Sequence, residues 1–438
     1  MADLRTRFLG IHSPNPFWLA SAPPTDKAYN VNRAFEAGWG GVVWKTLGEE
    51  GPPIVNVSEP RYGAMHSADR RVIGFNNIEL ITDRPLAVNL AEIRQLKRDW
   101  PDRAMVVSLM VPCTEAAWKA IVPRVQDTGA DGIELNFGCP HGMSERGMGS
   151  AVGQVPEYIQ MVTEWCKQAT RMPVIVKLTP NISDIRQPAR AAKAGGADAV
   201  SLINTVSSIM GVDLERMTMS PAIAGMGSHG GYCGPAVKPI ALNMVAEIGR
   251  DAATRGLPIS GIGGIGNWRD AAEYIALGCG NVQVCTAAMV YGFRIVQDMV
   301  DGLSQFMDAK GYRSIEDFRG KAVPTVRDWQ QLNLNITEKA VIDQDLCIQC
   351  GRCHVVCEDT SHQAITASKD GRRWFEVKEE ECVGCNLCPS VCPVSGCITM
   401  RRLVPGETDL RTGQPVLGEH ADWTTHPNNP MRRKPEMA

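Results

Sequence analysis

The chain has 438 residues, of which 44% are hydrophobic and 21% charged, and its formal net charge is −3. This length exceeds one ordinary hydrophobic core, so we expect two or three domains of a soluble globular protein. The small net charge gives no electrostatic basis for binding nucleic acid or an anionic membrane. The sequence has no apolar run long enough to span a bilayer and no secretory leader, which predicts a cytoplasmic protein.

Short apolar runs alternate with longer, helix-patterned segments from residue 17 to about residue 290. The runs predicted to be strands are Phe17–Ser21, Gly41–Lys45, Ala104–Met110, Gly132–Asn136, Pro173–Leu178, Ala199–Asn204, Pro258–Ile262 and Asn281–Cys285. Several helical segments end in a glycine before the next strand, as at Gly38 and Gly278, which is typical of a βα repeat. Eight such units predict a (β/α)₈ TIM barrel over residues 1–311. An open, doubly wound sheet is the alternative, because alternation alone does not show closure.

Polar residues follow many of the predicted strands, which also favours a closed barrel. In such barrels the catalytic groups lie at the C-terminal ends of the strands. Here those ends carry lysines, amides, hydroxyls and a pair of glycines, which indicates a polar cofactor pocket. The connections Thr46–Leu86 and Thr205–Lys238 are too long for plain loops, so we expect them to cover a substrate.

Nine of the fifteen cysteines fall between Cys347 and Cys397. Two runs have the spacing C-x₂-C-x₂-C-x₃-C that is typical of two-cluster bacterial ferredoxins, where the fourth cysteine of each run binds the other cluster. Residues 341–400 are therefore predicted to form a small ferredoxin-like α+β domain with two [4Fe-4S] clusters. One cluster would bind Cys347, Cys350, Cys353 and Cys392, and the other Cys382, Cys385, Cys388 and Cys357. Paired zinc sites are the alternative, although structural zinc prefers separated C-x₂-C pairs.

Residues 312–340 are expected to be a polar linker and residues 401–438 a polar C-terminal arm. Two low-potential clusters transfer electrons and do no organic chemistry themselves. The barrel pocket is therefore expected to hold a group that accepts single electrons and passes hydride, for which flavin is the candidate.

Seven segments occur in an order that resembles the dihydropyrimidine dehydrogenase family, within the dihydroorotate dehydrogenase superfamily. They are NPFWLASA, FEAGWGGVVWKT, FNNIELI, ELNFGCPHGMSERGMG, IVKLTPN, INTVSS and ISGIGGI. The resemblance covers residues 8–400 and is to the FMN- and pyrimidine-binding half with its C-terminal ferredoxin domain. It implies a bacterial-type catalytic subunit that works with a separate subunit binding FAD and NAD(P)H. It also implies a homodimer within a hetero-oligomer, where the clusters of one subunit serve the flavin of its mate.

The same resemblance implies two sets of contacts at the barrel mouth. FMN would be contacted by Ala20, Ser21, Lys45, Lys177, Gly263, Gly264 and Thr286. The pyrimidine would be contacted by Asn77, Glu79, Asn136, Asn204 and Thr205. The chemistry agrees, because an amide-rich set suits the alternating donors and acceptors of uracil. Orotate would instead call for a positive charge facing its carboxylate.

The segment NFGCPHGMSERGMG, residues 136–149, is a glycine-rich loop with one cysteine, Cys139. A thiol near its reference pKa of about 8.5 is mostly protonated at neutral pH and can act as a general acid. Cys139 is predicted to protonate C5 of the pyrimidine from the face opposite the hydride, on a lid that His141 anchors. The alternative is a turn with an inert buried thiol. The family more often has serine where Gly138 stands, which leaves the choice among uracil, thymine and a related cyclic imide open.

These observations predict an oxidoreductase acting on CH–CH groups, an NAD(P)-linked enzyme that reduces the C5=C6 bond of uracil and thymine. One alternative is a dihydroorotate dehydrogenase or another flavin ene-reductase of the same barrel. A second is a non-catalytic electron-transfer subunit whose barrel serves as a docking platform.

Overall fold

The computed structural model describes residues 2–49, 54–368 and 373–432. It divides into two compact units, Met1–Val326 and Arg327–Ala438. No helix among the described residues combines the length and the apolar character needed to cross a membrane.

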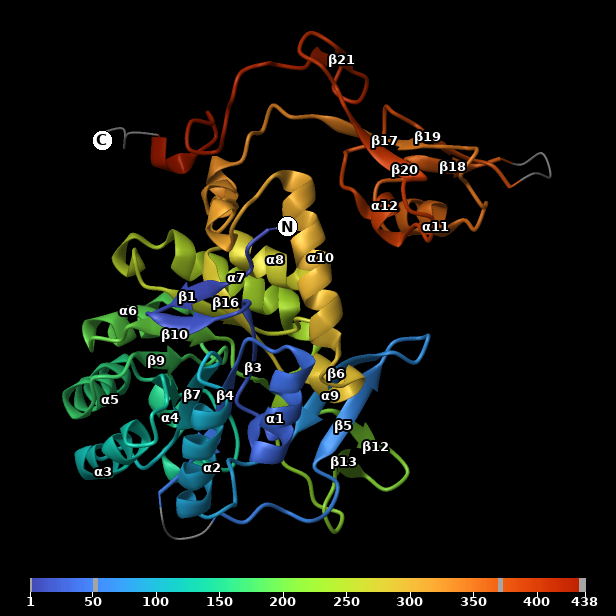
Figure 1. The fold of residues 1–438 in the computed structure, drawn as a ribbon. Coiled ribbons are helices and arrows are strands. Elements are labelled where there is room, and N and C mark those ends of the chain that lie inside the picture. Colours follow the sequence, from blue (N-terminus) through green and yellow to red (C-terminus); the bar gives the residue numbers. More distant parts are fainter. Residues whose placement is uncertain (1, 50–53, 369–372, 433–438) are drawn as a thin grey trace, which may run out of the picture. The chain divides into compact units, whose positions relative to one another are not determined.

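The first unit is built on a closed barrel of eight parallel strands (Figure 1). The strands are β3 Phe17–Leu19, β4 Gly41–Leu47, β7 Ala104–Leu109, β8 Gly132–Asn136, β9 Val174–Lys177, β10 Ala199–Leu202, β15 Ile259–Ile262 and β16 Cys279–Val284. Closure is achieved where β16 pairs with β3, with Val282 opposite Phe17. All eight predicted strands and the TIM barrel are thus confirmed, and the open sheet is excluded.

Helices surround the barrel, and the longer ones bury an apolar stripe against it. They are α1 Ala28–Ala37, α2 Leu86–Asp99, α3 Glu115–Gln126, α4 Ser150–Gly153, α5 Pro156–Ala169, α6 Arg186–Ala194, α7 Lys238–Arg250, α8 Trp268–Ala276, α9 Thr286–Tyr291 and α10 Ile295–Lys310. In α2, for example, Leu90, Ile93 and Leu96 are buried at helical spacing. Gly38 ends α1 at a φ of 115°, in the left-handed region that favours glycine.

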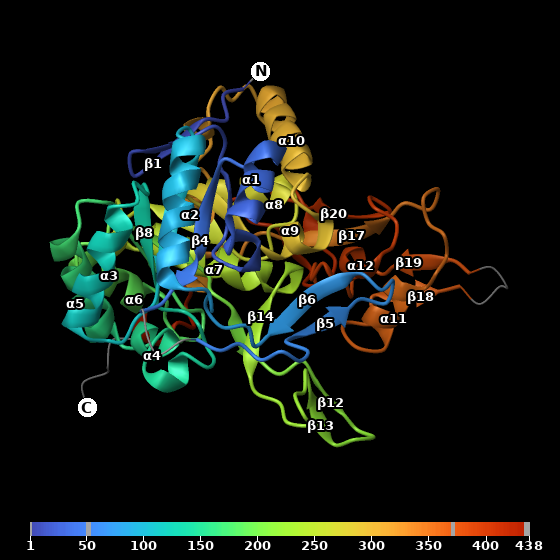
Figure 2. The same cartoon turned by 60° about the horizontal axis from the view of Figure 1, so that its bottom comes forward.

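The two long connections form a second sheet rather than separate loops (Figure 2). Its order is β11-β14-β6-β5, from β11 Val206–Ser208, β14 Gly230–Cys233, β6 Val72–Asn77 and β5 Tyr62–His66. A separate hairpin follows β11, formed by β12 Gly211–Asp213 and β13 Thr218–Ser220. Because β14 pairs with β6, Gly231 lies opposite Asn77, and substrate residues predicted on different connections are brought together.

The second unit is a small α+β domain around a core of cysteines, as predicted. Its strands are β17 Glu338–Ile342, paired with β20 Ile398–Arg402, and β18 Ile365–Ala367, paired with β19 Phe375–Val377. Its helices are α11 Arg352–Glu358 and α12 Leu387–Val391, and β21 Thr408–Asp409 pairs with β22 Gln414–Pro415. Both helices carry cysteines of the two predicted runs into the core.

The boundary between the units differs from the expected linker at 312–340. Ile315 and Phe318 lie in the hydrophobic core of the barrel unit, and Tyr312 stacks on Phe318 with ring centroids 5.4 Å apart. These apolar residues sit in a polar stretch without periodicity, which is why the sequence pattern did not reveal them. In the second unit, residues beyond 401 return to the start of that unit. There the Trp423 N–H donates to the Gln330 carbonyl at 3.0 Å.

An ion pair in the second unit ties this C-terminal segment to the cysteine module. Lys339 is almost fully buried, with Nζ 2.6 Å from Asp409 Oδ1. Its ammonium also donates to the carbonyls of Glu379 and Cys382. We expect Lys339→Met to destabilise this unit by about 3–5 kcal/mol, because it leaves a buried carboxylate without its cation. Chemical unfolding, followed by the visible absorbance of the predicted iron–sulfur clusters in the second unit, would measure the loss of unfolding free energy.

The neighbouring pair of Arg402 and Glu338, at 3.0 Å, provides the matched control because the Arg402 side chain is 64% exposed. Arg402→Met should cause a much smaller loss of stability. Equal losses in the two variants would contradict the role given to Lys339.

Candidate active site

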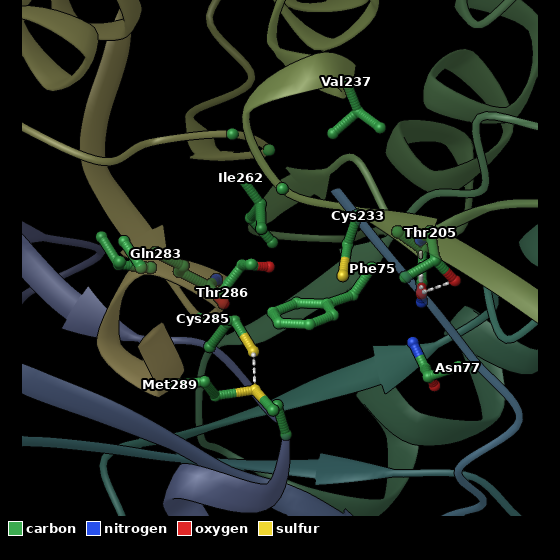
Figure 3. Close-up of a pocket in the computed structure, with 18 of the residues that line it drawn as sticks. Phe75, Asn77, Thr205, Cys233, Val237, Ile262, Gln283, Cys285, Thr286 and Met289 are labelled. Carbon is green, nitrogen blue, oxygen red and sulfur yellow. Dashed lines mark hydrogen bonds between the residues drawn. The ribbon is translucent and has the colours of Figure 1, made fainter. Parts of the chain in front are cut away.

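A cavity of about 470 Å³ lies at the C-terminal ends of the barrel strands and is also lined by β5, β6 and β14. Its volume is within the range of about 300–1,000 Å³ that is usual for ligand and cofactor sites. All the residues predicted for the barrel site line it: Ala20, Ser21, Lys45, Asn77, Glu79, Asn136, Cys139, His141, Lys177, Asn204, Thr205, Gly263, Gly264 and Thr286. Figure 3 shows Asn77 and Thr205 on one side of this cavity and Gln283 and Thr286 on the other.

A chain of hydrogen bonds fixes the amides at the strand ends. Asn136 Nδ2 donates to Thr46 Oγ1 at 3.0 Å, and Asn136 Oδ1 accepts from Asn204 Nδ2 at 2.9 Å. Asn204 Oδ1 in turn accepts from the Thr205 N–H at 2.8 Å. Thr46 Oγ1 also lies 3.1 Å from Ser21 Oγ, on the side predicted for the cofactor. An amide nitrogen has two donors, and these bonds use one N–H of each asparagine.

The two predicted lysines each have a carboxylate partner. Lys45 Nζ lies 2.8 Å from Glu79 Oε1, whose other oxygen lies 3.2 Å from Arg61 Nη1. Lys177 Nζ lies 3.4 Å from Oε1 of the fully buried Glu134. Both lysine side chains are therefore held at the cavity wall by a carboxylate partner.

Sequence reasoning missed Glu134, Gln283 and Arg61. Glu134 Oε2 accepts from Ser201 Oγ at 2.8 Å and from Gln283 Nε2 at 3.1 Å, across the inside of the barrel. The sequence did contain a signal for Glu134, because a charged residue within the buried strand Gly132–Asn136 requires a polar or charged partner. For Arg61 the sequence offers no such signal, since it lies in the long connection after β4.

Cys139 lies on the lid and is itself buried. Its Sγ lies 3.5 Å from the His141 carbonyl, and 8% of the residue is exposed. His141 Nε2 donates to the Glu79 carbonyl at 2.9 Å, and His229 Nε2 donates to the Pro140 carbonyl at 3.0 Å. Because both acceptors are carbonyls, Nε2 must carry the proton in each ring. The two histidines therefore hold the lid to the segment after β6 and to the segment before β14.

Burial raises the pKa of the Cys139 thiol to about 11, and the His141 backbone and the charge of Lys177 offset only part of this effect. Burial also lowers the pKa of His141. At neutral pH the site thus holds a protonated thiol beside a neutral imidazole, which is the state required of a proton donor.

The cavity residues fit a flat, polar cofactor with a phosphate. Gly263 and Gly264 have φ values of 131° and 68°, and a Cβ on Gly264 would lie 2.9 Å from the Lys238 nitrogen. The chain thus approaches itself here in a way that only glycine permits. Phe75, Cys233, Cys285 and Met289 add apolar and sulfur-bearing side chains to the cavity wall (Figure 3), with Cys285 Sγ 3.6 Å from Met289 Sδ. Such a wall suits an aromatic ring.

Two small cavities in the second unit gather the cysteines in the quartets expected from the spacing. One is lined by Cys347, Cys350, Cys353 and Cys392, and the other by Cys357, Cys382, Cys385 and Cys388. Cys397, expected to be a small core residue, is buried and also lines the first cavity. Within the described ranges, no three His, Cys, Asp or Glu side chains are grouped so that they could hold a single metal ion. Each quartet surrounds a space instead, and four thiolates around a space are the donor set of a cubane cluster.

Comparison with known proteins agrees with both units. Residues 3–307 match the dihydroorotate dehydrogenase family, and residues 340–400 match the 4Fe-4S dicluster domain. The chain is 41% identical over 412 residues to the NAD-dependent dihydropyrimidine dehydrogenase subunit PreA of Escherichia coli K12, covering 94% of this chain and 97% of that protein.

Two further relatives match the barrel region. The chloroplastic dihydropyrimidine dehydrogenase (NADP(+)) of Arabidopsis thaliana is 41% identical over 329 residues, covering 73% of this chain and 77% of its own length. The catalytic subunit of dihydroorotate dehydrogenase B (NAD(+)) of Pyrococcus abyssi is 35% identical over 323 residues, covering 73% and 99%. The chain therefore belongs to the dihydroorotate dehydrogenase superfamily and, within it, to the dihydropyrimidine dehydrogenase subunits, as an oxidoreductase with a C-terminal 4Fe-4S dicluster domain.

Proposed function

We propose that the protein reduces the C5=C6 bond of uracil and thymine to the 5,6-dihydropyrimidine, with Cys139 as the proton donor. The observation that carries this proposal is the presence, in one cavity, of a buried protonated thiol and a fixed set of amides. Asn77, Asn136 and Asn204 offer both donors and acceptors to a pyrimidine edge. Glu79 adds a carboxylate that can accept from a ring N–H.

The charges at the cavity support a neutral base rather than orotate. Among the described residues that line it, the cations are Lys45, Lys177 and Lys238. Each is paired with a carboxylate, and Lys238 Nζ lies 2.6 Å from Asp270 Oδ1. A substrate carboxylate would therefore have to compete with an existing ion pair.

The cofactor proposed for the barrel is FMN, which when bound would supply hydride for C6 and exchange single electrons with the clusters. Lys177 would hold the polar edge of its ring, while Gly263 and Gly264 would admit its phosphate. Residues of the chain would carry out the other steps, which are substrate orientation, exclusion of water and proton donation. The amides orient the pyrimidine, the lid carrying His141 excludes water, and Cys139 Sγ gives its proton to C5.

Electrons are proposed to arrive through the two [4Fe-4S] clusters from a partner subunit that binds FAD and NAD(P)H. The relative from Escherichia coli is named an NAD-dependent subunit, which supports a partner that supplies the nicotinamide site. A homodimer within a larger hetero-oligomer remains part of this proposal.

Anaerobic turnover tests the proposed reaction. The protein, reduced with dithionite, is mixed with uracil, thymine or orotate, and the products are separated by chromatography. We expect dihydrouracil and dihydrothymine and no dihydroorotate. Consumption of orotate alone would establish a dihydroorotate dehydrogenase. Consumption of no substrate, with clusters that still reduce an added acceptor, would establish an electron-transfer subunit.

The pKa of Cys139 predicts opposite pH profiles for the two directions of the reaction. Reduction needs the thiol, so its rate should not fall through ionisation of Cys139 until the pH approaches 11. Oxidation of dihydrouracil needs the thiolate as base, so its rate should rise about tenfold per pH unit below that pKa. Single-turnover rates in both directions between pH 7 and 10 would measure this. A reductive rate that falls with a midpoint near pH 8 would contradict it.

A further inference from the structure

Two glycines, one from the lid and one from β14, lie directly against neighbouring cavity residues. Gly138 precedes Cys139 in the lid, and a Cβ built on it would lie 2.3 Å from Asn204 Cβ and 2.5 Å from Asn204 Nδ2. Gly231 lies on β14, and a Cβ there would lie 2.1 Å from Thr205 Oγ1 and 2.6 Å from Thr205 Cβ. Real Cβ atoms essentially never come this close to another atom, so any side chain at either position forces a displacement.

Space, rather than backbone conformation, requires glycine at both positions. Neither Gly138 nor Gly231 is among the glycines with a positive φ, so an L-residue could adopt either backbone. Asn204 cannot retreat easily, because its N–H donates to the Leu178 carbonyl of the barrel at 3.1 Å. Its Cβ moves only with that backbone. A side chain at 138 must therefore displace either the strand end or the lid.

The displaced groups line the cavity and belong to the set predicted to contact the pyrimidine. Asn204 donates to Asn136 Oδ1, and Thr205 donates its N–H to Asn204 Oδ1, so the two residues hold one polar surface together. The Gly231 carbonyl also accepts from Asn77 Nδ2 at 3.0 Å. The two glycines thus enclose the Asn204–Thr205 pair between the lid and the sheet over the barrel.

We propose that Gly138 and Gly231 are positioning residues, which seat the Asn204–Thr205 pair against the pyrimidine by leaving its two flanks without side chains. This inference rests on the proposed function and names residues that act on the substrate only through their neighbours. It also gives a physical reason for glycine at 138, where the resembled family more often has serine. A serine in this structure would overlap Asn204.

The test compares the holoenzymes of Gly138→Ala, Gly231→Ala and Gly211→Ala. Gly211 is the matched control, because it lies in β12 with open space around its Cβ position and has no positive φ. Uracil affinity is measured from the change in flavin absorbance, together with kcat, KM, FMN content and iron content. We expect the first two variants to keep FMN and iron and to bind uracil about tenfold more weakly, the equivalent of one lost hydrogen bond. Gly211→Ala should match the wild type.

Rescue distinguishes a positioning role from a general defect. In an Asn204→Gly background, Gly138→Ala should weaken uracil binding no further, whereas Gly231→Ala should still do so. In a Thr205→Gly background, Gly231→Ala should weaken uracil binding no further, whereas Gly138→Ala should still do so. Unchanged uracil affinity in both alanine variants, loss of FMN from them, or an effect of Gly138→Ala that persists without the Asn204 side chain would each overturn the inference. If the wild-type protein binds no pyrimidine at all, the proposed function itself fails, which is a separate result.

Discussion

Replacing Cys139 by alanine should lower the rate of uracil reduction by about 10²–10⁴-fold, the usual contribution of a general acid. The barrel, the cofactor and the clusters should persist, because Cys139 lies on the lid outside the main barrel core. KM for uracil should change little, since the amides that orient the ring are untouched. Single-turnover rates, with flavin and iron contents measured on the same samples, would check this.

Cys113→Ala is the matched control for this experiment. Cys113 is a half-buried thiol whose pKa is also raised by burial, and it is not among the residues that line the cavity. Its replacement should leave the rate unchanged. If the thiol at position 139 were inert, the two variants would have equal rates of uracil reduction. That result would contradict the role of Cys139 as the general acid.

Replacing Cys392 by alanine should remove one of the two clusters and interrupt electron transfer to the barrel. Although Cys392 ends the second cysteine run, it lines the cavity of Cys347, Cys350 and Cys353. The iron content should fall from about eight to about four atoms per chain, as expected when one of two [4Fe-4S] clusters is lost. Iron analysis and electron paramagnetic resonance of the reduced protein would measure this loss.

The identity of the lost cluster can be tested by combining variants. Cys347→Ala added to Cys392→Ala should remove no further iron, whereas Cys382→Ala added to it should remove nearly all. Cys397→Ala is the control, because Cys397 lines the same cavity outside the four-cysteine set and should leave both clusters in place. Loss of iron on replacing Cys397, or the reverse pattern in the combined variants, would contradict the assignment.

Much of the barrel could be predicted because its signals are local. Each strand is a short buried run, and many of them are followed by polar residues that the closed barrel brings to one end. Residues as distant as Ser21 and Asn204 could therefore be assigned to one site from their position after a strand. The two cysteine quartets could likewise be predicted from the sequence, because cysteines separated by two residues place their thiolates around one cluster and the fourth cysteine of each run binds the other.

What could not be predicted depends on contacts between distant segments. The pairing of β14 with β6 joins residues more than 150 positions apart, and no periodicity in either connection indicates it. The partners of the charged groups were equally hidden. Glu134 was visible as a charge in a buried strand, but only the structure shows that Lys177, Ser201 and Gln283 surround it.

The proposed reaction is tested most directly by an anaerobic titration of the oxidised, reconstituted protein with dihydrouracil and, separately, with dihydroorotate. We expect dihydrouracil to bleach the flavin absorbance of the wild-type protein, the Cys139→Ala variant to respond far more slowly, and dihydroorotate to have no effect. Bleaching by dihydroorotate with no response to dihydrouracil would contradict the proposed reaction.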